Sequence, residues 1–380
     1  MKASYKRYVL NFKRPGGTSR GVLTQKETWF IIIEDQSHYG IGECGILRKL
    51  SIDDRPDYEE KLDWTCKNIT LGKEKLWEAL KEFPSIQFGV EQAFVSLKNQ
   101  QPQGKTAKYK SEPPQKNIST QASGHIKSHL VRRSPFQLFP SDFSTGKAAI
   151  NINGLVWMGD EAFMREQITE KIAAGFGCIK MKIGAIDFET ELKLLQSIRK
   201  TFSAKEIELR VDANGAFAPN EALDKLRRLS ELELHSIEQP IKQGQWEEMA
   251  ALCRETPLPI ALDEELIGVF DVTKKKELLQ TIKPQYIILK PSLVGGYRGA
   301  EEWINLCEGM NIYWWITSAL ESNIGLNAIA QWTYTLNNNM PQGLGTGSLF
   351  TNNIESPLEV KNGALQYNSS REWNWQSTIL

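Results

Sequence analysis

Residues 207–212 read Ile207-Glu-Leu-Arg-Val-Asp212, and this run indicates most clearly how the chain folds. Its apolar and charged residues alternate, which is the period-two pattern of a β-strand with two different faces. The apolar face carries Ile207, Leu209 and Val211, and the charged face carries Glu208, Arg210 and Asp212. We expect the apolar face to meet covering helices and the charged face to point into the interior of a closed sheet.

Short β-rich runs recur on both sides of this strand and alternate with helical stretches such as 187–200 and 220–229. Repeated strand–helix–strand units predict a parallel sheet with helical crossovers, and eight of them close a barrel. The predicted fold is therefore an α/β barrel over about residues 146–354. Its expected strands are 149–152, 178–183, 207–211, 235–238, 260–263, 286–289, 312–317 and a weak eighth near 342–344.

The chain outside the barrel divides into two regions. Residues 1–100 mix strand signals at 9–10 and 28–33 with helical patterns at about 58–69, 73–82 and from 88, and they predict an α+β module. Between the two strands and the helices, residues 39–45 are rich in glycine and predict a turn. Residues 101–145 are rich in Gln, Lys, Ser and Pro, so we expect a polar, mobile insertion or linker there.

Composition excludes several classes of function. The 380 residues carry 46 basic and 46 acidic side chains, so the net charge of zero gives no electrostatic reason to expect nucleic acid or a membrane surface as a partner. No apolar run approaches the roughly 20 residues that span a bilayer. The five cysteines are scattered and never spaced as CxxC, which favours a reducing cytoplasm without a disulfide framework.

Ionisable residues end the expected strands at a regular interval. Lys182, Asp212, Glu238, Asp263 and Lys290 follow one another by about one strand–helix unit each. Because the carboxyl ends of barrel strands open on one face, these five groups should converge at one mouth. A single Asp or Lys at a strand end is as often a solvated loop residue, but five at successive unit spacings indicate a site.

The residue types predict the chemistry of that site. Asp212, Glu238 and Asp263 form a hard oxygen set suited to Mg²⁺, with Mn²⁺ as an alternative, and the absence of His and Cys argues against zinc. Lys182 and Lys290 are four strands apart, so they should face each other across the mouth. Lys180 and the metal would both favour the neutral form of Lys182, as a general base requires.

Five motifs together resemble the enolase superfamily, in its muconate-lactonising branch. They are Lys180-Met-Lys182, Val211-Asp-Ala-Asn-Gly215, Ile237-Glu-Gln-Pro240, Leu262-Asp-Glu264 and Leu289-Lys-Pro-Ser292. The resemblance implies a (β/α)7β TIM-like barrel with an N-terminal α+β capping domain, to which residues 355–380 can return. Within the branch, Arg210, Thr317-Ser-Ala-Leu-Glu-Ser322 and Gly343-Leu-Gly-Thr346 are most similar to the o-succinylbenzoate synthase family.

This resemblance implies an activity and a set of roles. The activity is dehydration of a cyclohexadiene carboxylate, 2-succinyl-6-hydroxy-2,4-cyclohexadiene-1-carboxylate, to 2-succinylbenzoate in menaquinone synthesis. Lys182 would move the proton, Lys290 would stabilise the intermediate from the other face, and Mg²⁺ would hold the enediolate. The substrate-binding residues would be Arg210, Thr317, Ser318, Gly343 and, in the expected capping loop at 18–24, Arg20.

Two kinds of alternative remain open. N-acylamino acid racemases and dipeptide epimerases of the same branch use two opposed lysines as paired acid and base. Gly343-Leu-Gly345 carries no charge, whereas dipeptide epimerases hold the substrate ammonium with Asp-x-Asp in this region, so an N-acyl substrate fits better. A non-catalytic barrel that only binds a ligand is the other alternative, and the presence of all five ionisable residues speaks against it. The sequence leaves the oligomeric state open.

Overall fold

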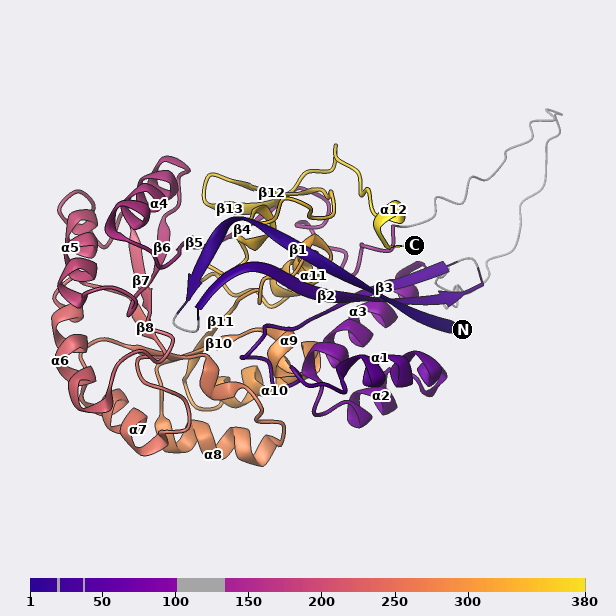
Figure 1. Cartoon of the computed structure of the whole chain (residues 1–380), viewed down its shortest axis with the longest axis horizontal. Helices are drawn as coiled ribbons and strands as arrows, with labels where there is room; N and C mark the ends of the chain where they lie inside the picture. The colour runs from indigo at the N-terminus through magenta and orange to yellow at the C-terminus, as the bar shows by residue number, and fades with distance from the viewer. Residues whose placement is uncertain (19–20, 37, 101–133, 380) are drawn as a thin grey trace, which may run out of the picture.

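The computed structural model describes residues 1–18, 21–36, 38–100 and 134–379. Its centre is a parallel sheet of seven strands in which each strand pairs with its neighbour in the sequence (Figure 1). These strands are β5 (Gly154–Val156), β6 (Cys178–Lys182), β7 (Glu208–Asp212), β8 (Ser236–Glu238), β9 (Ile260–Leu262), β10 (Tyr286–Leu289) and β11 (Tyr313–Ile316).

Residues 342 and 343 close the sheet into a barrel. Gln342 bridges in parallel to Ile152, and Gly343 bridges in parallel to Thr317. The eighth strand expected near 342–344 is therefore this short link, and the predicted TIM-like barrel is confirmed. The first strand was placed too early, at 149–152. Residues Ala149–Asn151 form β4 of another sheet, and β5 starts the seven-stranded one.

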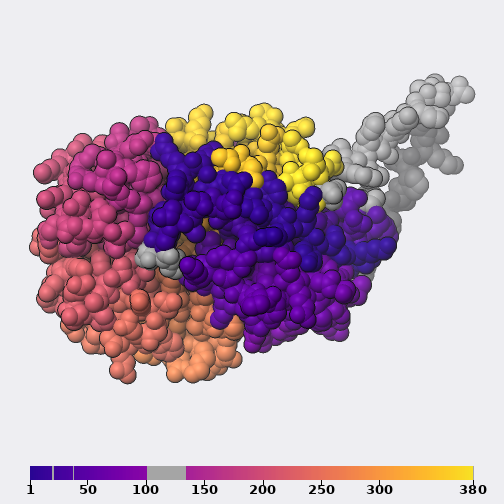
Figure 2. All heavy atoms as spheres, viewed as in Figure 1, coloured from indigo at the N-terminus to yellow at the C-terminus, as the bar shows by residue number. Residues whose placement is uncertain are grey.

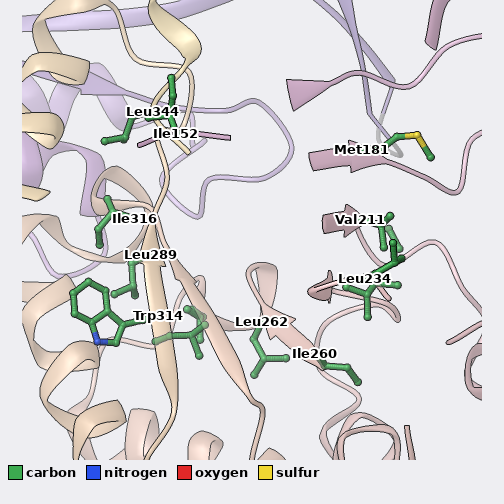
Figure 3. Close-up of a cluster of buried hydrophobic side chains, with 14 of the residues drawn as sticks. Ile152, Met181, Val211, Leu234, Ile260, Leu262, Leu289, Trp314, Ile316 and Leu344 are labelled. Atoms are coloured by element: carbon green, nitrogen blue, oxygen red, sulfur yellow. The ribbon is translucent and has the colours of Figure 1, made fainter. Parts of the chain in front are cut away.

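Helices cover the outside of the barrel. The apolar face of each strand packs against them, as the alternation in 207–212 predicts: Leu209 and Val211 are fully buried in the main core. Figure 3 shows this core, with Met181 of β6, Val211 of β7, Leu262 of β9 and Leu289 of β10. The covering helices are α4 (Glu161–Ala173), α5 (Phe188–Arg199), α6 (Pro219–Ser230), α7 (Trp246–Glu255), α8 (Val272–Ile282), α10 (Gly296–Glu308) and α11 (Asn323–Thr335). The short helix α9 (Pro291–Val294) follows Lys290 at the mouth and packs on α10 and on the N-terminal module.

The N-terminal module is an antiparallel sheet backed by helices. Its strands are β1 (Lys2–Thr18), β2 (Gly21–Asp35) and β3 (His38–Gly45). Strands β2 and β3 pack on α3 (Pro84–Gln100), and β1 packs on α1 (Tyr58–Lys67), with α2 (Lys73–Ala79) beside α3. The long β1–β2 hairpin reaches across to the barrel, where Phe12 bridges to Phe350 and Gly17 to Met158 (Figure 1). Figure 2 shows the module, in indigo and violet, lying against the barrel as a cap.

Residues 39–45 are a strand, not the predicted turn. The glycines that suggested a turn instead let a helix approach the backbone of β3. A Cβ atom on Gly42 would lie 1.9 Å from the carbonyl oxygen of Gly89 in α3, and one on Gly40 would lie 2.1 Å from that of Ala93. Neither contact is sterically possible, so glycine is required at both positions for the strand and the helix to pack this closely.

Gly42→Ala is expected to lower the free energy of unfolding by roughly 2–3 kcal/mol, because the added methyl group meets helix backbone that cannot rotate away. Urea titration of both proteins measures the change. Gly177→Ala is the matched control, since a Cβ at Gly177 has no atom within 4 Å and this glycine is not in the left-handed region. Equal destabilisation by the two substitutions would contradict the packing role of Gly42.

The C-terminal part of the chain contacts both the barrel domain and the N-terminal module, in part through a third sheet. Strands β12 (Leu358–Lys361) and β13 (Ala364–Tyr367) form a hairpin through Asn362 and Gly363, both at positive φ, and β13 pairs with β4. This Asn-Gly turn is a hairpin signal that the sequence analysis overlooked. Trp375 and, in α12 (Gln376–Ile379), Ile379 are buried with Phe30 and Ile41 of the capping sheet.

A buried carboxylate ties the module to the barrel at a second place. Glu91 of α3 accepts hydrogen bonds from the N–H groups of Tyr297 (2.6 Å) and Arg298 (3.4 Å) in the first turn of α10. Burial raises the pKa of Glu91 to about 7. The folded protein therefore keeps a proton on this side chain between pH 4.5 and 7 that the unfolded chain releases, so this group makes folding less favourable as the pH rises through that window.

We expect Glu91→Gln to remove this dependence. The amide oxygen of glutamine can still accept from the same backbone, and it carries no charge to bury. The variant should therefore gain stability relative to wild type as the pH rises from 5 to 8, by on the order of 2 kcal/mol. Melting temperatures of the two proteins at each pH measure this difference, and a constant difference would contradict it. Asp53, whose pKa burial raises to about 6, is common to both proteins and cancels.

The structure describes residues 134–145, the last part of the predicted polar insertion. Residues 101–133, and with them most of the predicted linker, lie outside the described residues, as does Arg20. Phe136 and Leu138, which follow the insertion, are buried, and Phe136 stacks on Trp373 with ring centroids 4.1 Å apart. None of the helices in the described ranges is long and apolar enough to cross a bilayer.

Candidate active site

The carboxyl ends of five neighbouring strands bring the five predicted ionisable residues together. Lys182, Asp212 and Glu238 are the last residues of β6, β7 and β8. Asp263 and Lys290 immediately follow β9 and β10. The three carboxylates are at most 2% exposed, so the low-dielectric interior strengthens every interaction among the charges.

Ammonium groups lie between the carboxylates. Asp212 pairs with Lys180 at 3.0 Å and with Lys182 at 2.8 Å. Lys180 also pairs with Glu238, and Lys290 pairs with Asp263 and lies 3.9 Å from Glu238. Three lysines therefore balance three carboxylates.

The pKa values follow from burial and from these pairs. Burial alone would raise the pKa of Asp212, but Lys180 and Lys182 lower it well below its usual range. Burial lowers the pKa of Lys180, but the neighbouring Asp212 and Glu238 raise it by more than burial lowers it, so the net shift is upward. The pKa of Lys290 is raised for the same reason, by Asp263 and Glu238. The pKa of Glu238 is well above normal because the side chain is buried beside Asp212 and Asp263.

The donor set fits a divalent cation. Both carboxylate oxygens of Glu238 are buried and accept no hydrogen bond, although the ammonium of Lys180 is close to one of them. Three carboxylates on consecutive strands are the oxygen ligands that Mg²⁺ prefers. Within the described ranges no three acidic, His or Cys side chains form a ready-made metal cluster, which is consistent with ammonium groups standing between them.

A cavity of about 290 Å³ opens between the barrel mouth and the capping module. From the barrel, Lys180, Lys182, Asp212 and Lys290 line it. Residues of the module that line it include Lys13, Arg14, Leu23, Leu47 and Leu50. The two predicted lysines therefore border one space, which the module completes.

Thr317, Ser318 and Gly343 lie on the barrel side of this cavity. A Cβ atom on Gly343 would lie 2.4 Å from the hydroxyl oxygen of Thr317, so only glycine leaves room for this threonine. The Ser318 hydroxyl donates to Glu321 at 2.5 Å and accepts from Thr346 at 2.8 Å. Both of its hydrogen-bonding roles are therefore filled by the protein.

Arg210, which was predicted to bind substrate, lies away from the cavity. Its side chain is 1% exposed, and it is not among the residues that line the cavity. The guanidinium lies 4.2 Å from the ring centroid of Trp315 and donates to Glu208 (2.7 Å) and to the carbonyl oxygen of Pro341 (3.0 Å). The charged face of β7 points into the barrel as expected. Arg210, however, lies two residues before the strand end, so its side chain points into the packed interior below the mouth.

Asn214 is a site residue that the sequence analysis left without a role. Its side-chain oxygen accepts from the Lys182 ammonium at 2.7 Å, and its amide nitrogen donates to Glu264 at 3.0 Å. The Asn-Gly pair in the motif Val211-Asp-Ala-Asn-Gly215 was the available sequence signal, because these two residue types favour a turn. In the structure Asn214 and Gly215 both have positive φ, and the turn brings the Asn214 side chain to Lys182.

Fold and site together define a class of protein. A barrel whose mouth holds three carboxylates and three lysines beside a capped cavity can stabilise negative charge on a bound carboxylate while a lysine moves a proton. The model of the family described as enolase C-terminal domain-like matches residues 163–370. The chain belongs to the enolase superfamily, and within it to the o-succinylbenzoate synthase family.

Relatives of high and of low sequence identity are consistent with this assignment. The chain is 46% identical to the o-succinylbenzoate synthase of Desulfotalea psychrophila over 96% of this chain and 98% of that protein. The crystal structure of MenC from that organism superposes with a TM-score of 0.77 at 41% identity, covering 96% of this chain and 99% of that one. A dipeptide epimerase from Enterococcus faecalis, solved with Mg and a dipeptide, shares the fold at 18% identity, with a TM-score of 0.76 over 96% of both chains.

Proposed function

We propose that this chain dehydrates 2-succinyl-6-hydroxy-2,4-cyclohexadiene-1-carboxylate to 2-succinylbenzoate, as a step of menaquinone synthesis, and that it depends on a divalent metal. One observation carries the proposal: Lys182 and Lys290 border the same cavity, beside the carboxylate cluster. The high identity to an o-succinylbenzoate synthase over nearly the whole chain supports this reaction in particular.

The metal would be held by Asp212, Glu238 and Asp263. Mg²⁺ is the proposed ion, with Mn²⁺ as the alternative, since a hard cation suits three carboxylates. When bound, such an ion would stabilise the negative charge that develops on the substrate carboxylate.

Lys182 is the proposed base. It takes the proton from the carbon next to the carboxylate and later delivers it to the leaving hydroxyl, so one C–H and one C–O bond break and water leaves. Asn214 orients its ammonium through the 2.7 Å hydrogen bond. Lys290 stabilises the anionic intermediate from the other side, and Lys180 adds positive charge beside Lys182.

The charge around the cavity suits a substrate with two carboxylates. Of the ionisable side chains that line it, two are acidic, Glu170 and Asp212, whereas six are basic: Lys13, Arg14, Lys171, Lys180, Lys182 and Lys290. An excess of positive charge favours a dianion over the ammonium group of a dipeptide. We propose that Thr317 and Gly343 contact the succinyl end, and that Ser318 supports this surface through its hydrogen bonds.

A cytoplasmic location belongs to the same proposal. All five cysteines are buried free thiols, as expected in a reducing compartment. The direct test of the function is turnover: purified protein with Mg²⁺ and the cyclohexadiene carboxylate should form an aromatic product that is absorbing in the ultraviolet. No product at any Mg²⁺ concentration would contradict the proposed reaction.

N-acylamino acid racemisation is the second candidate. The same observation favours it, because two lysines bordering one cavity could act as paired acid and base. The uncharged Gly343-Leu-Gly345 stretch leaves no carboxylate there for a free amino group.

A further inference from the structure

Glu43 of the capping module is a buried carboxylate that binds the barrel. It lies in β3 and is fully buried. One carboxylate oxygen accepts from the N–H of Ser322 at 2.9 Å, and the other accepts from the N–H of Gly325 at 2.9 Å and from the Ser322 hydroxyl. These groups form the start of α11, so the carboxylate sits on a helix N-terminus, where negative charge is stabilised.

The charge of Glu43 is held by hydrogen bonds and by the helix. Its remaining partner is the Thr28 hydroxyl of β2, which donates at 2.8 Å. Among the described residues, no basic side chain forms an ion pair with Glu43. The Thr28 hydroxyl also lies 3.3 Å from a second acceptor, the carbonyl oxygen of Cys44. The three barrel donors, from Ser322 and Gly325, therefore depend most on this carboxylate, and removal of its charge leaves them buried without an acceptor of equal strength.

The start of α11 leads directly to the cavity. Glu321, adjacent to Ser322, accepts from the Ser318 hydroxyl at 2.5 Å and from the Ser292 hydroxyl at 2.6 Å. Ser318 in turn accepts from Thr346, and both of these residues line the cavity. A displacement of the α11 N-terminus would therefore be passed to the surface proposed to contact the succinyl end.

Glu43 also precedes the part of the module that completes the cavity. Leu47 and Leu50, four and seven residues further along the chain, line it from the side of the module. Through Glu43, the module's cavity loop and the barrel's Thr317–Ser318 segment are fixed to a common point. Both sides of the cavity thus share one anchor outside the catalytic cluster.

We propose that Glu43 is a positioning residue that sets the distance between the capping module and the substrate-binding surface after β11. It does not touch the reacting atoms and acts through Ser322, Glu321 and Ser318. The part of this proposal that concerns substrate affinity rests on the proposed function. The part that concerns the α11 N-terminus does not.

The test compares wild type with Glu43→Gln and with Ser96→Ala. Glutamine keeps the size of the side chain but replaces one acceptor by an NH₂ group that would face buried N–H donors. Ser96→Ala is the matched control, since it removes two hydrogen bonds of a buried side chain of the module, one from the N–H of Ile41 and one to the carbonyl oxygen of Pro135. The Ser96 side chain makes neither of these bonds to residues 317–326, the segment in which exchange is measured. Amide hydrogen exchange is measured for peptides covering 317–326, and KM, kcat and Mg²⁺ affinity are measured on the same three proteins.

Faster exchange over 317–326 is expected in Glu43→Gln and not in Ser96→Ala. The KM of Glu43→Gln should rise by about 10-fold or more, because loss of positioning weakens substrate contacts, while kcat and Mg²⁺ affinity change by less than about 3-fold. Unchanged exchange over 317–326, or an unchanged KM, would overturn the proposal.

The positioning role stays testable if the wild-type protein shows no turnover or if Glu43→Gln does not fold. If wild type shows no turnover, the proposed reaction fails, and the exchange measurement alone decides the positioning role. If Glu43→Gln does not fold, Glu43→Asp replaces it, because aspartate keeps the charge and withdraws it by one methylene, and the same criteria apply.

Discussion

Lys182→Ala is expected to lower kcat for the dehydration by about 10³-fold or more, because it removes the group that carries the proton in both halves of the reaction. Mg²⁺ should still bind, since the three carboxylates remain. Steady-state kinetics and calorimetric titration of Mg²⁺ measure the two properties on the same preparation. A variant that keeps more than a tenth of the wild-type kcat would show that another group is the base.

Lys290→Arg is the companion variant. Arginine keeps the positive charge beside Asp263 and Glu238, so it should retain part of the dehydration activity, though its planar shape fits the ammonium's place imperfectly. In a racemase the same change removes one of two proton carriers, because arginine does not deprotonate in proteins. The ratio of the two losses therefore separates one-base from two-base chemistry.

Loss of the metal is the second large effect. EDTA should abolish turnover and Mg²⁺ should restore it. Glu238→Gln should weaken Mg²⁺ binding by about 100-fold or more, because Glu238 lies between Asp212 and Asp263 and its two buried oxygens accept no hydrogen bond from the protein.

Glu265→Gln is the control for this substitution. It makes the same chemical change at another buried carboxylate, one that is already held by the N–H of Gly244 (2.7 Å) and the amide of Gln239 (3.1 Å). Mg²⁺ affinity should be close to wild type in this control. Full activity of metal-free wild-type protein would contradict the metal's role, as would equal Mg²⁺ affinities of the two variants.

The central part of the fold was predictable because local sequence determines it. Each barrel strand is a short apolar run, and the residue at its end is fixed at the mouth by the parallel arrangement itself. The five ionisable residues therefore lie where the spacing placed them. The closing link at 342–343 was weak in the sequence, and in the structure it is held by only a few backbone hydrogen bonds, such as that from Gly343 to Ile316.

The errors share a physical cause, which is contact between segments far apart in the chain. Gly40 and Gly42 suggested a turn, but glycine is required there because α3 approaches the strand closely, and the contacting residues of α3 are about 50 positions further along the chain. Arg210 was predicted to bind substrate from a family resemblance, whereas the residues that it contacts in the structure, Trp315 and Pro341, are more than 100 residues distant in the chain. Glu43 gave no signal for its contact with Ser322 for the same reason.

One-base dehydration and two-base racemisation can be compared in a single incubation of the Mg²⁺-loaded wild-type protein in D₂O with the cyclohexadiene carboxylate and an N-succinylamino acid together. Proton NMR follows the aromatic product of the first and α-deuterium exchange in the second. The proposed one-base synthase predicts formation of 2-succinylbenzoate with a much larger kcat/KM than any exchange. Rapid α-exchange without aromatic product would contradict it, and would assign the same barrel and the same lysines to racemisation.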